Sequence, residues 1–195
     1  MQTTTLSFNN IHDHGPLFTD LLRARHRTFI QQARWDLPQA DGMEFDQYDT
    51  PASRWVAVHE HGRILAGARL TPTTHRCGIY SYMIRDAQKG LLGTIPSDLL
   101  NEEAPVADHV WELSRGFVCD DVPAAIRMRV QMQLVAEVVG SARALGATSI
   151  LGLVSPILSR LGRRVGLECM PAGPMLEIDG SPCHCVGVSL AAKLH

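Results

Sequence analysis

The spacing of hydrophobic residues along the chain predicts first a helix and then a β-hairpin. Residues 17–33 carry apolar side chains at helical spacing, which predicts an amphipathic helix. Residues 54–70 hold two strand-like runs on either side of the turn pair His61-Gly62, which is the pattern of a hairpin. The next segment, 84–104, contains glycines and a proline, and it predicts loops with short helices.

The second half of the chain alternates strands with helices. A strand is predicted at 110–119, and Pro123 is placed to open a long helix that Gly146 ends. The remaining predicted elements are a strand at 149–154, a helix at 156–165, and strands at 174–179 and 184–190. A strand–helix series after an antiparallel hairpin predicts an α/β fold, namely an α/β/α sandwich with a mixed, largely antiparallel twisted sheet.

Composition favours one globular domain over residues 1–195, because no linker, repeat or low-complexity tract divides the chain. Only the ends are expected to be flexible, including about the first 15 residues. A net charge of −2 disfavours a nucleic-acid partner, since tracking along phosphates needs a marked excess of Lys and Arg. No stretch reaches the ~20 apolar residues of a membrane helix, and the start lacks a secretory signal, so we expect a cytoplasmic protein with no membrane segment.

The five cysteines are odd in number and scattered, which is typical of reduced thiols in a reducing compartment. The run Cys183-His184-Cys185 invites a metal-site interpretation. Alternation along a strand, however, puts His184 on the opposite face from both cysteines, and no second pair stands at zinc spacing. We therefore expect no metal site.

A local basic patch consists of Arg160, Arg163 and Arg164. Two interpretations stay open for it: a surface that receives a phosphate or an acidic carrier protein, and a solvated helix face with no partner.

Three carboxylates, Glu44, Asp46 and Asp49, lie close together with no adjacent Lys or Arg. One interpretation is a solvated acidic loop, since an isolated surface ion pair stabilises by only ~0–1 kcal/mol. The other is a charged site whose cations come from distant segments. The candidate cations are Arg25, Arg69 and Arg115.

The predicted strand at 110–119 has two different faces. Alternation puts Arg115 on the apolar face with Trp111, where an unpaired charge is costly. The other face carries Glu112 and Ser114, which could line a cleft. In such a cleft the carboxylate could remove a proton from a nucleophile. Gly116 is a candidate bulge that would bring Glu112 and Arg115 closer than strict alternation permits.

The charged and aromatic residues of these segments form an ordered set, Arg25-x-x-x-Phe29, Trp35, Glu44-x-Asp46-x-x-Asp49, Arg69 within ARLTPT, and Glu112-x-Ser114-Arg115. In this order the set resembles the LuxI-type autoinducer synthases, closely over about residues 20–120 and more weakly as far as Gly173-Pro174. The resemblance implies a fold related to the GNAT-type N-acetyltransferases. It implies an acyl-homoserine-lactone synthase, an acyltransferase of quorum sensing whose substrates are S-adenosylmethionine and an acyl thioester, with no cofactor.

The resemblance also implies roles for individual residues. To the S-adenosylmethionine site it assigns Arg25, Phe29, Trp35, Glu44, Asp46, Asp49 and Arg69, and to catalysis it assigns Glu112 and Arg115. Glu112, through a water, would take a proton from the substrate ammonium, and the free amine would attack the thioester. The substrate's own carboxylate would then displace methylthioadenosine and close the lactone.

The resemblance places the acyl pocket at Met83, Ser114, Gly116, Phe117, Gly152 and Ser155. Two features depart from the family: Gly116 stands where relatives commonly carry an aromatic residue, and the Phe-Pro usual after the Met-x-Arg-Asp stretch is missing. Gly152 aligns where many producers of 3-oxo chains have a threonine hydroxyl. We therefore expect an acyl chain that is not selected for a 3-oxo group.

The acyl donor stays open between acyl carrier protein and acyl-CoA. A CoA-binding loop of the form Gln/Arg-x-x-Gly-x-Gly/Ala is matched only in its first half, at 143–148 and 163–168. Two other functions fit the same fold. An N-acyltransferase acting on another amine with acyl-CoA would not need S-adenosylmethionine, and a non-catalytic binding module would not need Glu112.

Overall fold

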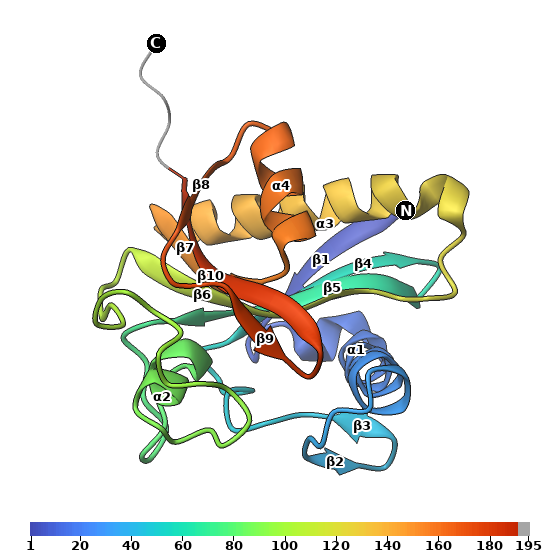
Figure 1. Ribbon diagram of the computed structural model, residues 1–195. Coiled ribbons are helices and arrows are strands. Elements are labelled where there is room, and N and C mark those ends of the chain that lie inside the picture. The colour runs from blue at the N-terminus through green and yellow to red at the C-terminus, as the bar shows by residue number, and fades with distance from the viewer. Residues whose placement is uncertain (191–195) are drawn as a thin grey trace. The chain divides into compact units, whose positions relative to one another are not determined.

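The computed structural model describes residues 1–190 (Figure 1). The strands are β1 (Gln2–Leu6), β2 (Gln39–Ala40), β3 (Met43–Glu44), β4 (Arg54–Glu60), β5 (Arg63–Pro72), β6 (Val110–Val118), β7 (Ser149–Val154), β8 (Glu168–Pro171), β9 (Leu176–Ile178) and β10 (Ser181–Ser189). The helices are α1 (Leu17–Arg25), α2 (Met83–Gln88), α3 (Ala124–Ala144) and α4 (Pro156–Arg164), with a 3₁₀ turn η1 (Ile11–His14) and a π-helical segment η2 (His26–Gln32).

The described residues form two compact units. The first contains residues 1–70 and 115–141, and the second contains residues 71–114 together with residues from 142 onward. Strand β6 and helix α3 each contribute residues to both units. The expectation of a single domain stays a prediction.

In the first unit the sheet begins with strands β1, β4 and β5, which pair antiparallel. The predicted hairpin is confirmed as β4 and β5, and its turn residues His61 and Gly62 have φ values of 50° and 81°. Two successive positive φ values are the signature of the tight turn that best matches the twist of two paired strands. The His61-Gly62 pair therefore fixes the pairing of Glu60 with Arg63, and an irregularity between Val58 and His59 then shifts the register to the one in which Trp55 lies opposite Arg69.

Helices cover both faces of the sheet in the first unit (Figure 1). A Cβ built on Gly67 of β5 would lie 2.5 Å from Leu21 Cδ1, so α1 packs closely on that face. On β1, Thr5 Oγ1 donates to Glu137 Oε1 of α3 over 3.0 Å. Because Thr5 is level with Val56, and Val56 with Ala68, its side chain lies on the face opposite to that of Gly67.

In the second unit β6 and β7 pair in parallel, from Val110–Ser149 to Leu113–Gly152. Strand β10 pairs antiparallel with β7, β8 and β9. One parallel pair beside these antiparallel pairs gives the mixed, largely antiparallel sheet that the sequence predicts.

Helices α2 and α4 cover opposite faces of this part of the sheet. Glu112 is level with Leu151, and its carboxylate reaches backbone N–H groups of α2. His184 is level with Val154, three residues from Leu151 and therefore on the other face. Its Nε2 lies 3.3 Å from Ser159 Oγ on α4. Each unit thus contains part of the sheet with a helix on either side.

Strand β6 contains one residue more than the stretch of β5 beside it. Backbone hydrogen bonds run from Cys119 N to Leu65 O and from Thr73 N to Val110 O. These two bonds are eight residues apart along β5 and nine residues apart along β6. Arg115, which lies between them, has a φ of 52°, so the extra residue forms a β-bulge at this point.

The bulge bears on two predictions. A bulge was expected at Gly116, and the residue with positive φ is its neighbour Arg115. The predicted alternation that put Arg115 on the face of Trp111 does not continue through the bulge, because one extra residue reverses the order of the faces.

Strands β1 and β8 are among those that the pattern of hydrophobic residues did not predict. Strand β1 has the sequence QTTTL and lies in the stretch for which flexibility was expected. Strand β8 has the sequence ECMP and is only four residues long. Both runs are too polar or too short to carry a strand signal of their own.

Candidate active site

Six charged side chains of the first unit form one buried ion-pair network. Its members are Arg25 on α1, Glu44 on β3, Asp46 and Asp49 in the following loop, Arg69 on β5 and Arg115 on β6. None of these side chains exposes more than 9% of its surface. Three positive and three negative charges balance, which is the condition under which a buried network is tolerable.

Asp49 joins two of the arginines. Arg25 donates to both of its oxygens, Nη1 to Oδ1 over 2.7 Å and Nη2 to Oδ2 over 2.9 Å. Arg69 Nη1 lies 3.1 Å from Oδ1. Trp55 Nε1 donates to the same oxygen over 2.7 Å. The paired N–H groups of Arg25 match the two carboxylate oxygens, so this contact fixes orientation as well as distance.

Glu44 and Asp46 connect the third arginine, Arg115, to the other two. Glu44 lies between Arg25 Nε at 2.5 Å and Arg115 Nε at 3.1 Å. Asp46 receives Arg69 Nη1 and Nη2 at 2.5 and 3.2 Å, and Arg115 Nη2 lies 2.8 Å from its Oδ2. The bulge at Arg115 thus carries a side chain that ties β6 to both acidic segments.

The loop that carries the aspartates is held by its own side chains. Asp46 Oδ1 accepts from the Tyr48 N–H over 2.8 Å, and Asp49 Oδ2 accepts from the Asp46 N–H over 2.9 Å. An Asp side chain that bonds the backbone two or three residues away is the usual way in which this residue stabilises a turn. The spacing Asp-x-x-Asp therefore both shapes the loop and aims its two carboxylates.

The arginines control the charge state of the aspartates. Burial alone would raise the pKa of Asp49, but Arg69 and Arg25 outweigh burial and hold that pKa well below its usual range. Burial alone would also raise the pKa of Asp46, but the charges of Arg69 and Arg115 outweigh burial and lower that pKa. For Arg25, burial disfavours the cation, yet the charge of Asp49 prevails and raises its pKa.

Aromatic rings lie against the network. The rings of Phe29 and Trp35 are stacked, with centroids 5.1 Å apart and planes 13° from parallel. The Arg115 guanidinium carbon lies 5.6 Å from the Phe29 ring centre, and Phe117 meets Phe29 edge-on at 5.8 Å. The seven residues assigned to the S-adenosylmethionine site are therefore brought together with Arg115 in the first unit.

Two residues of this site were missed by the sequence analysis. Trp55 is fully buried and donates to Asp49, and the ring of Tyr48 lies 5.6 Å from the Arg69 guanidinium carbon. The signal for Trp55 was its place in the hairpin, where it is level with Arg69 in the register. Tyr48 lies inside the acidic run itself, between Asp46 and Asp49.

In the second unit Glu112 is fully buried at the start of α2. Its Oε1 accepts from the Ile84 N–H over 2.7 Å, and its Oε2 accepts from the Met83 N–H over 3.3 Å. The first N–H groups of a helix have no partner within the helix, so Glu112 supplies one for two of them. Met83, a predicted acyl-pocket residue, thus contacts the predicted base through its backbone.

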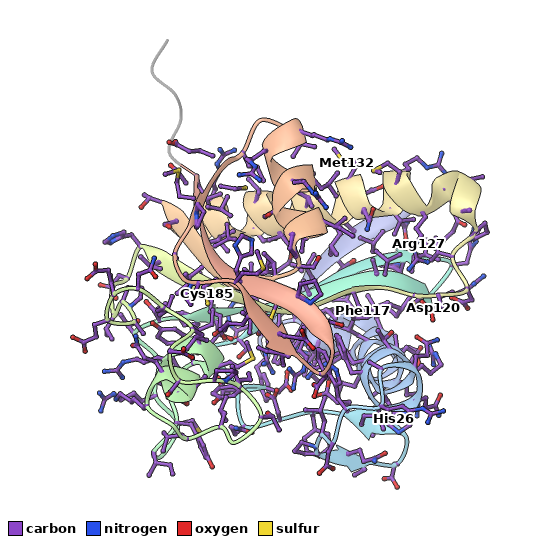
Figure 2. The ribbon with its side chains drawn as sticks, in the orientation of Figure 1. His26, Phe117, Asp120, Arg127, Met132 and Cys185 are labelled. Carbon is purple, nitrogen blue, oxygen red and sulfur yellow. The ribbon has the colours of Figure 1, made fainter. Side chains whose placement is uncertain are left out.

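Burial and the charge of Glu112 raise the pKa of two nearby groups. Burial, followed by the charge of Glu112, raises the pKa of Tyr82, whose hydroxyl donates to Pro105 O over 2.6 Å. Burial, and after it Glu112, also raises the pKa of the Cys185 thiol to about 12, and Figure 2 shows Cys185 on β10. A thiol of this kind stays protonated near neutral pH and is inert as a nucleophile.

The other predicted acyl-pocket residues lie in both units. In the second unit, Ser114 is buried, and Ser155 caps α4 by accepting a hydrogen bond from the Leu158 N–H. A Cβ placed on Gly152 would lie 3.4 Å from Leu113 O. In the first, Gly116 is exposed, and Phe117 is buried against Gly67.

No cluster of three or more His, Cys, Asp or Glu side chains suited to a metal ion occurs in residues 1–190. Over the same range, no helix has the length and apolar character needed to cross a membrane.

A model of a protein family described as "Autoinducer synthase" matches residues 9–176. The acyl-homoserine-lactone synthase of Ralstonia solanacearum is 31% identical over 189 residues, which cover 88% of this chain and 87% of that protein.

Solved structures agree in fold. TofI in a ternary complex with an inhibitor and MTA is 30% identical, has a TM-score of 0.78, and the match covers 99% of this chain and 94% of that one. A putative N-acetyltransferase from Lactobacillus plantarum has a TM-score of 0.57 at 14% identity, with 98% and 100% of the two chains covered. That second likeness is one of fold alone, and it agrees with the predicted relation to GNAT-type enzymes.

Proposed function

Because the chain belongs to the autoinducer synthase family, we propose that it is an acyl-homoserine-lactone synthase. It is an acyltransferase that moves an acyl group from a thioester to the amine of S-adenosylmethionine. Closure of the product into a lactone releases methylthioadenosine and yields a quorum-sensing signal. S-adenosylmethionine is a substrate, and the two steps are polar substitutions that require no redox cofactor.

The observation that carries this proposal is the six-residue network of the first unit, with its adjoining aromatic rings. S-adenosylmethionine presents a sulfonium, an ammonium and a carboxylate. The network offers fixed cations and anions in a buried frame, and Phe29 and Trp35 offer ring faces that attract a cation or stack on adenine. Since every charge of the network already has a partner, the frame is organised before the substrate arrives.

In the first step Glu112 accepts, through a water, the proton that the substrate ammonium must lose. The free amine then attacks the thioester carbonyl, the C–S bond breaks, and the thiolate leaves with a proton. The two backbone N–H groups that donate hydrogen bonds to Glu112 hold its carboxylate in place for this proton transfer. Arg115, anchored by Glu44 and Asp46, lies three residues after Glu112 in the sequence of β6.

In the second step the substrate carboxylate attacks the carbon next to sulfur, and the C–S bond to methylthioadenosine breaks. A negative carboxylate and a positive sulfonium become a neutral lactone and a neutral thioether. Loss of both charges is favoured where water is scarce. Holding the two ends of one molecule together is therefore the main task of the protein in this step.

For the acyl donor we propose acyl carrier protein. Helix α4 carries the exposed basic patch Arg160, Arg163 and Arg164, and Ile157 beside it is 69% exposed. An acidic protein with an apolar contact would be attracted to such a surface. The start of α3, where a helix could hold the pyrophosphate of CoA, is instead preceded by the exposed Asp120 and Asp121. Cytoplasmic location is proposed with it, because the free cysteines suit a reducing compartment.

The test is a reaction of the purified protein with S-adenosylmethionine and either acyl carrier protein thioesters or acyl-CoA. We expect lactone and methylthioadenosine in equal amounts, with the carrier protein as the better donor. Glu112→Gln should lower kcat by about 10²–10⁴-fold. The exposed Glu103→Gln is the matched control and should stay active. Acylation without release of methylthioadenosine would instead support an N-acyltransferase acting on another amine.

A further inference from the structure

A buried hydroxyl near Glu112 has no hydrogen-bond partner within residues 1–190. Thr71, close to the end of β5, is 0% exposed, and its Oγ1 makes no hydrogen bond to any described residue. Thr73, two residues on, is buried to a similar degree, but its Oγ1 donates to Ala107 O and Val110 O, each over 2.9 Å. Hydroxyls enclosed in a protein almost always have a partner, so the exception at Thr71 calls for one.

The strand pairing brings Thr71 next to Glu112. The Thr73 N–H donates to Val110 O over 3.2 Å, and β5 and β6 run in opposite directions. Thr71 comes two residues before Thr73 on β5, and Glu112 comes two residues after Val110 on β6. Thr71 therefore lies opposite Glu112. Residues directly opposite in antiparallel strands point to the same face, with their Cβ atoms about 4.5–5.5 Å apart. The hydroxyl and the carboxylate are therefore neighbours on one face of the sheet.

The carboxylate side of this pair is already fixed. Glu112 accepts hydrogen bonds from the Met83 and Ile84 N–H groups at the start of α2. A carboxylate oxygen can accept more than one hydrogen bond, so these contacts leave the group able to bind a water as well. A water bound there has a second polar neighbour in the Thr71 hydroxyl, and buried waters need two to four such partners.

We propose that Thr71 is a positioning residue that holds the water through which Glu112 removes the substrate proton. The inference rests on the proposed synthase reaction. The water accepts one hydrogen bond from the Thr71 hydroxyl and one from the substrate ammonium, and it donates one to Glu112. When the ammonium N–H bond breaks, its proton joins the water, and a proton of the water passes to Glu112. The amine keeps the electron pair with which it attacks the thioester.

Thr71→Val tests this assignment, since valine keeps the branched shape and removes only the hydroxyl. We expect kcat to fall about tenfold, as for the loss of one hydrogen bond in the transition state. KM for S-adenosylmethionine should change little, because the Thr71 hydroxyl makes no hydrogen bond to the six-residue network. Thr71→Ser restores the hydroxyl and should recover most of kcat.

Stability separates this role from a purely structural one. Removing a buried hydroxyl that has no protein partner should leave Tm unchanged or raise it in Thr71→Val. Thr73→Val is the matched control, because it removes a hydroxyl that has partners. It should lower Tm and leave the kcat of the folded protein near that of the wild type.

A double variant tests whether Thr71 acts through Glu112. In the Glu112→Gln background, Thr71→Val should cause no further loss of kcat. Wild-type kcat in Thr71→Val, or an equal loss in both backgrounds, would overturn the proposal while the synthase assignment stands. Absence of lactone from the wild type and from Thr71→Ser alike would instead reject the synthase reaction itself.

Discussion

At the scale of single residues, Asp49 links the charged network to the hydrophobic core. It receives two arginines on one side and the indole N–H of Trp55, which is 0% exposed, on the other. Breaking a buried ion pair by removing one partner is costly because it leaves an uncompensated charge. The same reasoning applies to Glu44, and for both carboxylates each of the two arginines retains one other carboxylate.

Asp49→Asn keeps the size of the side chain and removes its charge. We expect the free energy of unfolding to fall by about 3 kcal/mol, since Arg25 and Arg69 would then share too few carboxylates. Urea unfolding measures this difference. The matched control is Asp20→Asn, which removes an exposed partner of Arg23 at 3.0 Å and should cost less than about 1 kcal/mol. Equal losses in the two variants would contradict the central place given to Asp49.

At the scale of elements, the close packing of α1 on β5 depends on Gly67. A Cβ at this position would lie 2.5 Å from Leu21 Cδ1 and 2.9 Å from Phe117 Cε1. Both neighbours are buried and cannot move far. Gly67 thus sets the distance of the helix that carries Arg25 from the strand that carries Arg69.

Gly67→Ala should therefore destabilise the protein by about 1–3 kcal/mol through overpacking. Gly140→Ala on α3 is the matched control, because a Cβ there meets no atom within 4 Å. Alanine is the better helix former, so this second change should stabilise by up to about 1 kcal/mol. Thermal unfolding of both variants gives the comparison, and opposite signs are expected.

Elements with strong local signals could be predicted from the sequence. The β4–β5 hairpin follows from a turn pair that accepts positive φ, and α4 begins where Ser155 caps it and Pro156 follows. Strand β1 has no such signal, because its three threonines are as polar as a loop. It becomes a strand through pairing with β4 and through the bonds of Thr3 and Thr5 to Glu137, which join residues far apart in the chain.

The candidate site divides in the same way. The residue types and their order identified the members of the network, including Arg115. Which arginine faces which carboxylate could not be predicted, because it depends on the register of β4 with β5 and on the bulge in β6. The hydrogen-bond partner of Glu112 also could not be predicted, since tertiary folding brings the start of α2 to this residue.

At the scale of the whole molecule, the network makes stability depend on pH. The pKa values of Asp46 and Asp49 are lower in the folded state than the ordinary value near 3.9. The stability that they contribute is therefore fully present above that ordinary value, and it is lost as the pH falls through the folded-state pKa. Unfolding measured from about pH 6 down to about pH 2 should show a steep decline below about pH 4. In Asp49→Asn the decline should be shallower.

The extra residue in β6 also limits how such a protein can be recombined. Deleting one residue between Leu113 and Phe117 would remove the bulge and leave an unbroken alternation, so the backbone would no longer aim the Arg115 side chain at Glu44 and Asp46. A substitution in the same stretch leaves the number of residues, and so the bulge, unchanged. Chimeras assembled from related chains should therefore be joined outside residues 113–117, so that the strand is inherited together with its irregularity.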